Sequence, residues 1–145
     1  MGEYGWRSDR VKILFACVEN ACRSQMAEGF AGEYGDEEIE AFSGGSSPAE
    51  RVDPKAVEVM DELGIDIGFQ FPKRIDSAMT EESDAVVTMG CGSEACPVPI
   101  SGRHIEWDIE DPSGGSRSKF REVRDEIGRR VIVLLEELGN LSTDK

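Results

Sequence analysis

A cysteine and an arginine separated by five residues form the motif with the clearest chemistry in this sequence. The motif, CVENACR, runs from Cys17 to Arg23. It follows an apolar run at 11–16 that predicts a buried strand, and it precedes a segment of helical composition at 24–34. Five intervening residues can curl until their backbone N–H groups point at one centre, and the following helix adds its positive end. We therefore predict a cradle for a tetrahedral oxyanion, built from Val18, Glu19, Asn20, Ala21, Cys22, Arg23 and Ser24.

The cysteine that opens this motif is the predicted nucleophile. The positive field of the cradle favours the thiolate of Cys17, and the hydroxyl of Ser24 can donate a hydrogen bond to it. Arg23 carries a planar guanidinium that can bind two oxygens of the same anion. The alternative is a buried structural cysteine near a surface arginine. The position of the motif between a strand and a helix favours the nucleophile.

An aspartate–proline pair near the end of the predicted sheet is a candidate general acid. Asp111-Pro112 follows a short predicted strand at 105–107. A carboxyl group held beside a rigid proline can be aimed at a departing oxygen. With Ser113 and Gly114, the same residues also make good turn chemistry. Spacing alone leaves both interpretations open.

Two further cysteines, Cys91 and Cys96, suggest redox chemistry. They follow an apolar run at 84–89, so they are expected at the same carboxyl edge of the sheet as Cys17. Zinc binding is disfavoured because neither cysteine pair has C-x-x-C spacing and His104 is the only histidine. We predict no bound metal. Reduction of a bound oxyanion needs further thiols that supply electrons, whereas hydrolysis needs none. The alternative is that Cys91 and Cys96 are two incidental loop cysteines.

The remaining elements must place these residues together. Further strands are expected at 39–43, 84–89 and 105–107, and helices at 54–63 and 119–138. The last helix should face the core with Phe120, Val123, Ile127, Val131, Leu134, Leu135 and Leu138. Strands that alternate with helices predict an α/β fold, a single domain with a four-stranded parallel sheet and helices on both faces. Ligands in such sheets bind beyond the carboxyl ends of the strands.

Length and charge limit the domain organisation and the possible partners. The chain has 145 residues, and we predict a flexible tail at 1–10, one domain at 11–140 and a short tail at 141–145. No apolar run is long enough for a membrane span and no export signal is evident, so we expect a cytoplasmic protein. The net charge of −14 argues against nucleic-acid or anionic-membrane partners. Arg supplies 11 of the 16 basic residues, and an acid-rich, lysine-poor surface suits a protein that works in concentrated salt, where screening removes self-repulsion. The source is therefore halophilic, or the protein is simply an acidic bacterial or archaeal enzyme.

Several segments resemble the arsenate reductases built on the low-molecular-weight protein tyrosine phosphatase fold. They cover much of the chain between about 11 and 138, and they read CVENACRSQMAE, FSGG, VDPKA, AVVTM and WDIEDP. The resemblance implies that Cys17 is the nucleophile, Arg23 the oxyanion clamp, Asn20 a loop-shaping residue and Asp111 the acid. It also implies arsenate as substrate, with phosphate or sulfate as mimics. Cys91 and Cys96 would then relay electrons from thioredoxin or a low-molecular-weight thiol, with no cofactor bound.

Departures from that pattern keep some alternatives open. Cys91 and Cys96 are closer together than in the thioredoxin-coupled members, which leaves the reductant open. Asn20, Glu28 and Ser43 match a potassium site of those members, but Lys73 stands where its remaining acidic ligand is expected, so bound potassium is doubtful. Small residues follow Asp111-Pro112, where tyrosine phosphatases carry aromatic ones, which favours a small inorganic anion. The competing functions are a phosphatase for a phosphoprotein or small phosphoester, and an oxyanion-binding module without turnover.

Overall fold

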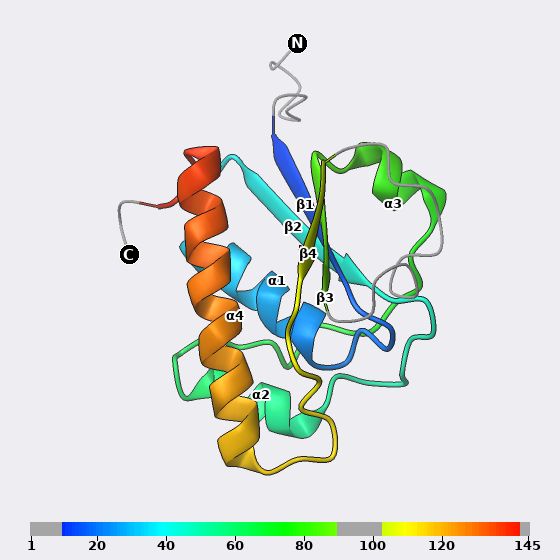
Figure 1. Ribbon diagram of the computed structural model, residues 1–145, viewed down its shortest axis with the longest axis vertical. Coiled ribbons are helices and arrows are strands. Elements are labelled where there is room, and N and C mark those ends of the chain that lie inside the picture. Colours follow the sequence, from blue (N-terminus) through cyan, green and yellow to red (C-terminus); the bar gives the residue numbers. More distant parts are fainter. Residues whose placement is uncertain (1–9, 90–102, 143–145) are drawn as a thin grey trace.

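The computed structural model describes residues 10–89 and 103–142, which form a parallel sheet and four helices (Figure 1). The strands are β1 (Val11–Ala16), β2 (Ile39–Gly44), β3 (Ala85–Met89) and β4 (Arg103–Trp107). Their order is β2-β1-β3-β4, and every neighbouring pair is parallel. The predicted four-stranded parallel sheet is confirmed. β4 begins two residues earlier than expected, because its ladder with β3 starts at Arg103 opposite Ala85.

The helices are α1 (Arg23–Tyr34), α2 (Pro54–Asp61), α3 (Ser77–Glu82) and α4 (Arg117–Leu138). Three of them confirm predicted helices, with α2 ending two residues early. As expected, α2 has Asp53 at its N-cap, where the side chain accepts a hydrogen bond from the backbone N–H of Lys55. The sequence did not predict α3. It is only six residues long, and its one buried residue, Thr80, leaves no apolar periodicity to detect.

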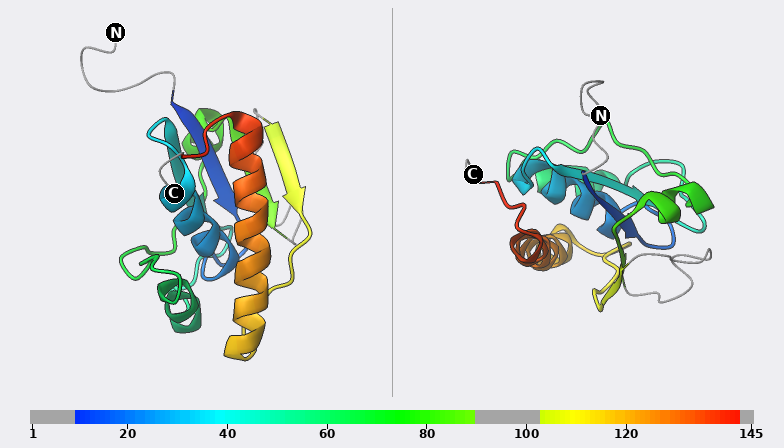
Figure 2. Two further views of the ribbon diagram at one scale, coloured as in Figure 1. Left: turned by 90° about the vertical axis from the view of Figure 1, so that its left-hand side faces the viewer. Right: turned by 90° about the horizontal axis from the view of Figure 1, so that it is seen from above.

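The sheet has two unequal faces, because successive side chains of a strand point in opposite directions. Ile13 and Phe15 of β1 belong to the large core, which α1, α2 and α4 cover. Leu14 and Ala16 point the other way into a small cluster that includes Ile75, with Met79 of α3 packed against it. Figure 2 shows α4 and α1 together on one face of the sheet. Helices therefore lie on both faces, and within residues 10–89 and 103–142 α3 is the one that packs on the second.

The long helix α4 packs its apolar face into the large core. All of its predicted core residues are buried except Leu138, which is partly buried. Gly128 allows α4 to approach α1 closely, because a Cβ at this position would lie 2.9 Å from the ring of Phe30. No helix in the described ranges is long and apolar enough to cross a membrane. The predicted N-terminal tail lies outside the described residues except for Arg10. At the other end, the backbone N–H of Ser142 donates to the carbonyl of Tyr34.

Candidate active site

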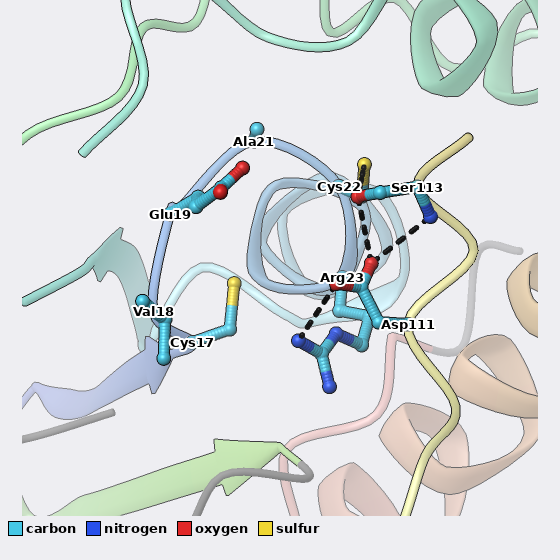
Figure 3. A pocket seen from close by; sticks show the side chains of 8 residues that line it. All are labelled: Cys17, Val18, Glu19, Ala21, Cys22, Arg23, Asp111 and Ser113. Atoms are coloured by element: carbon cyan, nitrogen blue, oxygen red, sulfur yellow. Dashed lines mark hydrogen bonds and ion pairs between the residues drawn. The ribbon is translucent and has the colours of Figure 1, made fainter. Parts of the chain in front are cut away.

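Cys17 stands immediately after the central strand β1, at the carboxyl edge of the sheet. Its side chain is almost completely buried and lies at the base of a pocket of about 200 Å³ (Figure 3). The pocket is lined by Cys17, Val18, Glu19, Ala21, Cys22, Arg23, Asp111 and Ser113. The loop from Cys17 leads directly into α1, whose N-cap residue Cys22 makes no side-chain cap hydrogen bond. The first-turn N–H groups of α1 therefore have no side-chain cap competing with an anion for them.

The backbone of the cysteine loop is held from outside by the segment that follows β2. The carbonyl oxygens of Val18, Glu19 and Ala21 accept hydrogen bonds from the backbone N–H groups of residues 47, 49 and 53, respectively. In a trans peptide the N–H points away from the C=O. Fixing these carbonyls on the outside of the loop therefore turns the next N–H groups inward. This is the geometry that an oxyanion cradle needs.

Gly45 makes this close approach possible. A Cβ at this position would lie 2.4 Å from the carbonyl oxygen of Val18 and 2.6 Å from that of Cys17. Both are backbone atoms that cannot rotate away, so any other residue at 45 would push the loop out of place. The sequence predicted only a strand at 39–43, and the contact of Gly45 with the cysteine loop was missed.

Asn20 and Ser24 lie behind the pocket and act on Cys17 from there. Asn20 is fully buried with a φ of 52°, a left-handed conformation that asparagine tolerates better than most residues. Its Nδ2 donates to Ser24 Oγ over 2.7 Å, and Ser24 Oγ lies 2.9 Å from Cys17 Sγ. Because the amide is the donor, the serine keeps its own proton for the sulfur. Ser24 is thereby set to stabilise a thiolate at Cys17.

Arg23 joins the cysteine loop to two distant segments. Its Nη1 donates to the carbonyl oxygens of Met89 at 2.7 Å and of Ile109 at 3.1 Å, and its Nη2 lies 3.7 Å from Asp111 Oδ2. Met89 is the last residue of β3, and Ile109 is two residues before Asp111. The buried guanidinium therefore joins the cysteine loop to the end of β3 and to the loop after β4, and it lies beside the predicted acid in one pocket.

The predicted acid reaches the pocket from the loop after β4. The Asp111 side chain is 52% exposed, and its Oδ1 accepts hydrogen bonds from Ser113, from the backbone N–H at 3.0 Å and from Oγ at 2.8 Å. The alternative interpretation of these residues as a turn is therefore correct, and the same turn presents the carboxyl group to the pocket, while the role of Asp111 as the acid stays a prediction. Sequence reasoning missed Ser113 as a pocket residue, and this turn pattern was the signal for it.

The surroundings of Cys22 disfavour its thiolate form, unlike those of a nucleophilic cysteine. Burial raises its pKa to about 12, and nearby carboxylates of Asp53 and Asp111 add to that effect. Its Sγ donates to Asp53 Oδ2 at 3.7 Å and lies 3.6 Å from Ser113 Oγ. The sequence predicted Cys22 as a residue of the oxyanion cradle, and it lines the pocket. These surroundings favour a protonated thiol that packs between α2 and the Asp111 loop.

We expect Cys22 to resist alkylation in the folded protein. With a pKa of about 12, only roughly one molecule in 10⁵ carries the thiolate at pH 7. Iodoacetamide at pH 7 should therefore leave Cys22 unmodified in buffer and modify it in 8 M urea, as measured by peptide mass mapping. Equal labelling rates in buffer and in urea would contradict the inert-thiol interpretation.

Other predicted residues separate into three groups. Val18, Glu19 and Ala21 line the pocket as expected, with the Glu19 side chain exposed. Asn20 and Ser24 do not line it, because both are fully buried behind Cys17. Cys91 and Cys96 lie outside the described residues.

The residues that match a potassium site are engaged with other protein atoms. Ser43 Oγ donates to Glu28 Oε1 over 2.6 Å, and Asn20 Oδ1 accepts from the backbone N–H of Lys73. The ammonium of Lys73 donates to the carbonyl of Phe71 and lies 5.0 Å from the centre of its ring. Both oxygens keep a lone pair beyond these hydrogen bonds, so the doubt about bound potassium, which rests on Lys73, stays a prediction.

Comparison with known proteins agrees with this arrangement. The family model of the low molecular weight phosphotyrosine protein phosphatases matches residues 12–143. Arsenate reductase 2 of Staphylococcus saprophyticus is 42% identical over 85% of this chain and 95% of its own length, and the glutaredoxin arsenate reductase of Synechocystis is 39% identical over 88% and 98%. A thioredoxin-dependent arsenate reductase structure from Corynebacterium glutamicum superposes with a TM-score of 0.79 at 32% identity, over 95% of this chain and 66% of that one. The chain belongs to the low molecular weight phosphotyrosine protein phosphatase family.

Proposed function

We propose that this protein reduces arsenate to arsenite with Cys17 as the nucleophile. The observation that carries the proposal is the pocket itself. Cys17 and Asp111 line one small cavity that Arg23 closes, and relatives about 40% identical over most of the chain are arsenate reductases. Ser113 lines the pocket beside the acid, and two glycines follow it in the sequence in place of aromatic residues, which suits a small inorganic anion.

In the first step, the Cys17 thiolate attacks the arsenic of the HAsO₄²⁻ dianion. A sulfur–arsenic bond forms and an arsenic–oxygen bond breaks. The departing hydroxide takes a proton from Asp111 and leaves as water. Arg23 and the inward-facing N–H groups of the loop hold the remaining oxygens. The product is a Cys17–arsenate thioester with the charge of the original dianion, and arsenic is still pentavalent.

In the second step, a further thiolate attacks Cys17 Sγ. A disulfide forms, the sulfur–arsenic bond breaks, and its electron pair stays on arsenic, which becomes trivalent and leaves as arsenite after taking up protons. We assign this attack to Cys91 and the final disulfide to Cys91 and Cys96. In support, Cys91 follows Met89 by only two residues, and the carbonyl of Met89 is bound to Arg23.

The electrons must come from an external thiol. The names of the relatives include a glutaredoxin arsenate reductase and a thioredoxin-dependent one, so a protein dithiol is the first candidate and a low-molecular-weight thiol the second. A cycle that needs free thiols at rest suits the reducing cytoplasm. The decisive assay measures arsenite release from arsenate with thioredoxin, glutaredoxin and glutathione supplied separately.

The relay makes a separate prediction. Replacing Cys91 or Cys96 with serine should stop multiple turnovers, while aryl-phosphate cleavage stays largely unchanged because it needs no electrons. Mass spectrometry after one turnover should find Cys17 linked to Cys91 in the Cys96→Ser protein, and Cys91 linked to Cys96 in the unmodified protein. If both variants keep full arsenate turnover, the two cysteines are bystanders.

Phosphatase activity is the second candidate function. Cys17, Arg23 and Asp111 are the groups that hydrolysis of a phosphomonoester through a cysteinyl phosphate requires, and the chain belongs to a phosphatase family. The two functions are separated by the need for thiol. Cleavage of an aryl phosphate without any added thiol, together with no arsenite release under any reductant, would favour the phosphatase.

A further inference from the structure

The two oxygens of the Asp111 carboxyl group have different neighbours. Oδ1 accepts both hydrogen bonds from Ser113, whereas Oδ2 lies on the side of Arg23 (Figure 3). The Asp111 side chain is about half exposed and its distance to Arg23 is 3.7 Å. The ion pair alone is therefore too long and too solvated to fix the carboxyl group. The two shorter contacts come from one residue, Ser113.

The hydroxyl of Ser113 has a defined direction. Its two near neighbours are Asp111 Oδ1 at 2.8 Å and Cys22 Sγ at 3.6 Å. A carboxylate oxygen is a much stronger acceptor than a thiol sulfur, so the serine proton goes to Asp111. Cys22 stays protonated at neutral pH and cannot compete as a thiolate. The proton of the thiol goes to Asp53, so Cys22 packs against the serine oxygen and does not take its proton.

We propose that Ser113 is a positioning residue that fixes which oxygen of Asp111 carries the catalytic proton. This proposal rests on the role of Asp111 as the acid. An oxygen that already accepts two hydrogen bonds has no room for a proton of its own, so the proton of the neutral acid sits on Oδ2. On transfer, the Oδ2–H bond breaks, the proton goes to the departing hydroxide, and its electron pair stays on the carboxylate. Ser113 already solvates Oδ1 at that moment, so the new charge needs no rearrangement.

Ser113→Ala tests the proposal directly. The variant loses the hydroxyl but keeps the backbone N–H, so the first step of arsenate reduction should slow by roughly tenfold, the effect of one hydrogen bond to a charged group. Phosphate affinity, measured by calorimetry, should stay the same because Ser113 stabilises the acid and not the anion. Ser113→Thr should restore the single-turnover rate.

A second readout separates positioning from simple structural damage. Aryl phosphates with a poor leaving group need the acid, and those with a good one hardly do. Ser113→Ala should therefore slow phenyl phosphate cleavage far more than p-nitrophenyl phosphate cleavage. Ser116→Ala is the matched control, because this serine accepts a hydrogen bond from the N–H of Lys119 as the N-cap of α4 and has no bond to Asp111.

The outcomes distinguish this proposal from the proposed function. In the Asp111→Asn background, the added Ser113→Ala change should have no further effect on the rate. If Asp111→Asn slows the first step but Ser113→Ala does not, or if Ser116→Ala causes the same loss, the positioning role of Ser113 is overturned. If no thiol supports arsenite release, the reductase proposal fails, while the aryl-phosphate comparison still tests Ser113.

Discussion

Cys17→Ser is expected to abolish arsenate reduction and aryl-phosphate cleavage together, with the fold intact. Both reactions begin with the same attack by Cys17 Sγ on a tetrahedral centre. A serine hydroxyl stays protonated at neutral pH, and no histidine or other base contacts position 17 to activate it within the described residues. The hydroxyl is smaller than the thiol and can keep a hydrogen bond to Ser24, so the site should lose its nucleophile and little else.

Four measurements check this expectation. Single-turnover arsenite release and p-nitrophenyl phosphate cleavage should both fall to background, whereas phosphate affinity by calorimetry should stay within a few-fold of the original. The thermal midpoint should change little, because the pocket loses only a sulfur atom. Retained turnover of either substrate would place the nucleophile elsewhere.

Asp111→Asn is expected to slow the first chemical step by about 10²–10⁴-fold, the usual contribution of a general acid. Hydroxide is a poor leaving group from an arsenate dianion unless it is protonated as it departs. Asparagine keeps the shape of the side chain and can still accept from Ser113, but it has no acidic proton. Anion binding should weaken little or even improve, because the change removes a negative charge beside Arg23.

The same loop offers matched controls for this variant. Asp108 and Glu110 are exposed carboxylates one to three residues away, and neither lines the pocket. Asp108→Asn and Glu110→Gln remove the same charge from the same loop, so they report any general electrostatic effect. Rates for all three variants that agree with one another would show that Asp111 is not the acid and that the proton comes from solvent.

The sequence predicted the parts of this site that depend on local pattern. The motif from Cys17 to Arg23, its place between a strand and a helix, and Asp111-Pro112 could all be read from neighbouring residues. The partners of Arg23 could not, since Met89 and Ile109 are 66 and 86 residues away in the chain. The spacing of residues in the sequence does not indicate which distant carbonyl groups a buried guanidinium will contact.

The same limit explains the other differences. Gly45 has a role only because the cysteine loop folds back onto it, and this contact follows from the pairing of β1 with β2. Ser24 lies within hydrogen-bond distance of Cys17, as the sequence suggested, but the buried Asn20 that donates to Ser24 could not be placed there from sequence. α3 was missed because its helical pattern is too short to stand out from a loop.

The contacts of Arg23 make the stability of the folded state depend on the anions in the buffer. The pocket requires β1, the end of β3 and the loop after β4 to meet at one guanidinium, so an unfolded chain has no comparable anion site. A ligand that binds only the native state stabilises it by RT ln(1 + [L]/Kd), about 2.7 kcal/mol when its concentration is 100 times the Kd. Under the proposed function, inorganic phosphate or sulfate that fills this pocket should protect the protein against denaturation and compete with arsenate. We therefore expect heat resistance and inhibition to rise together with the concentration of the same anion.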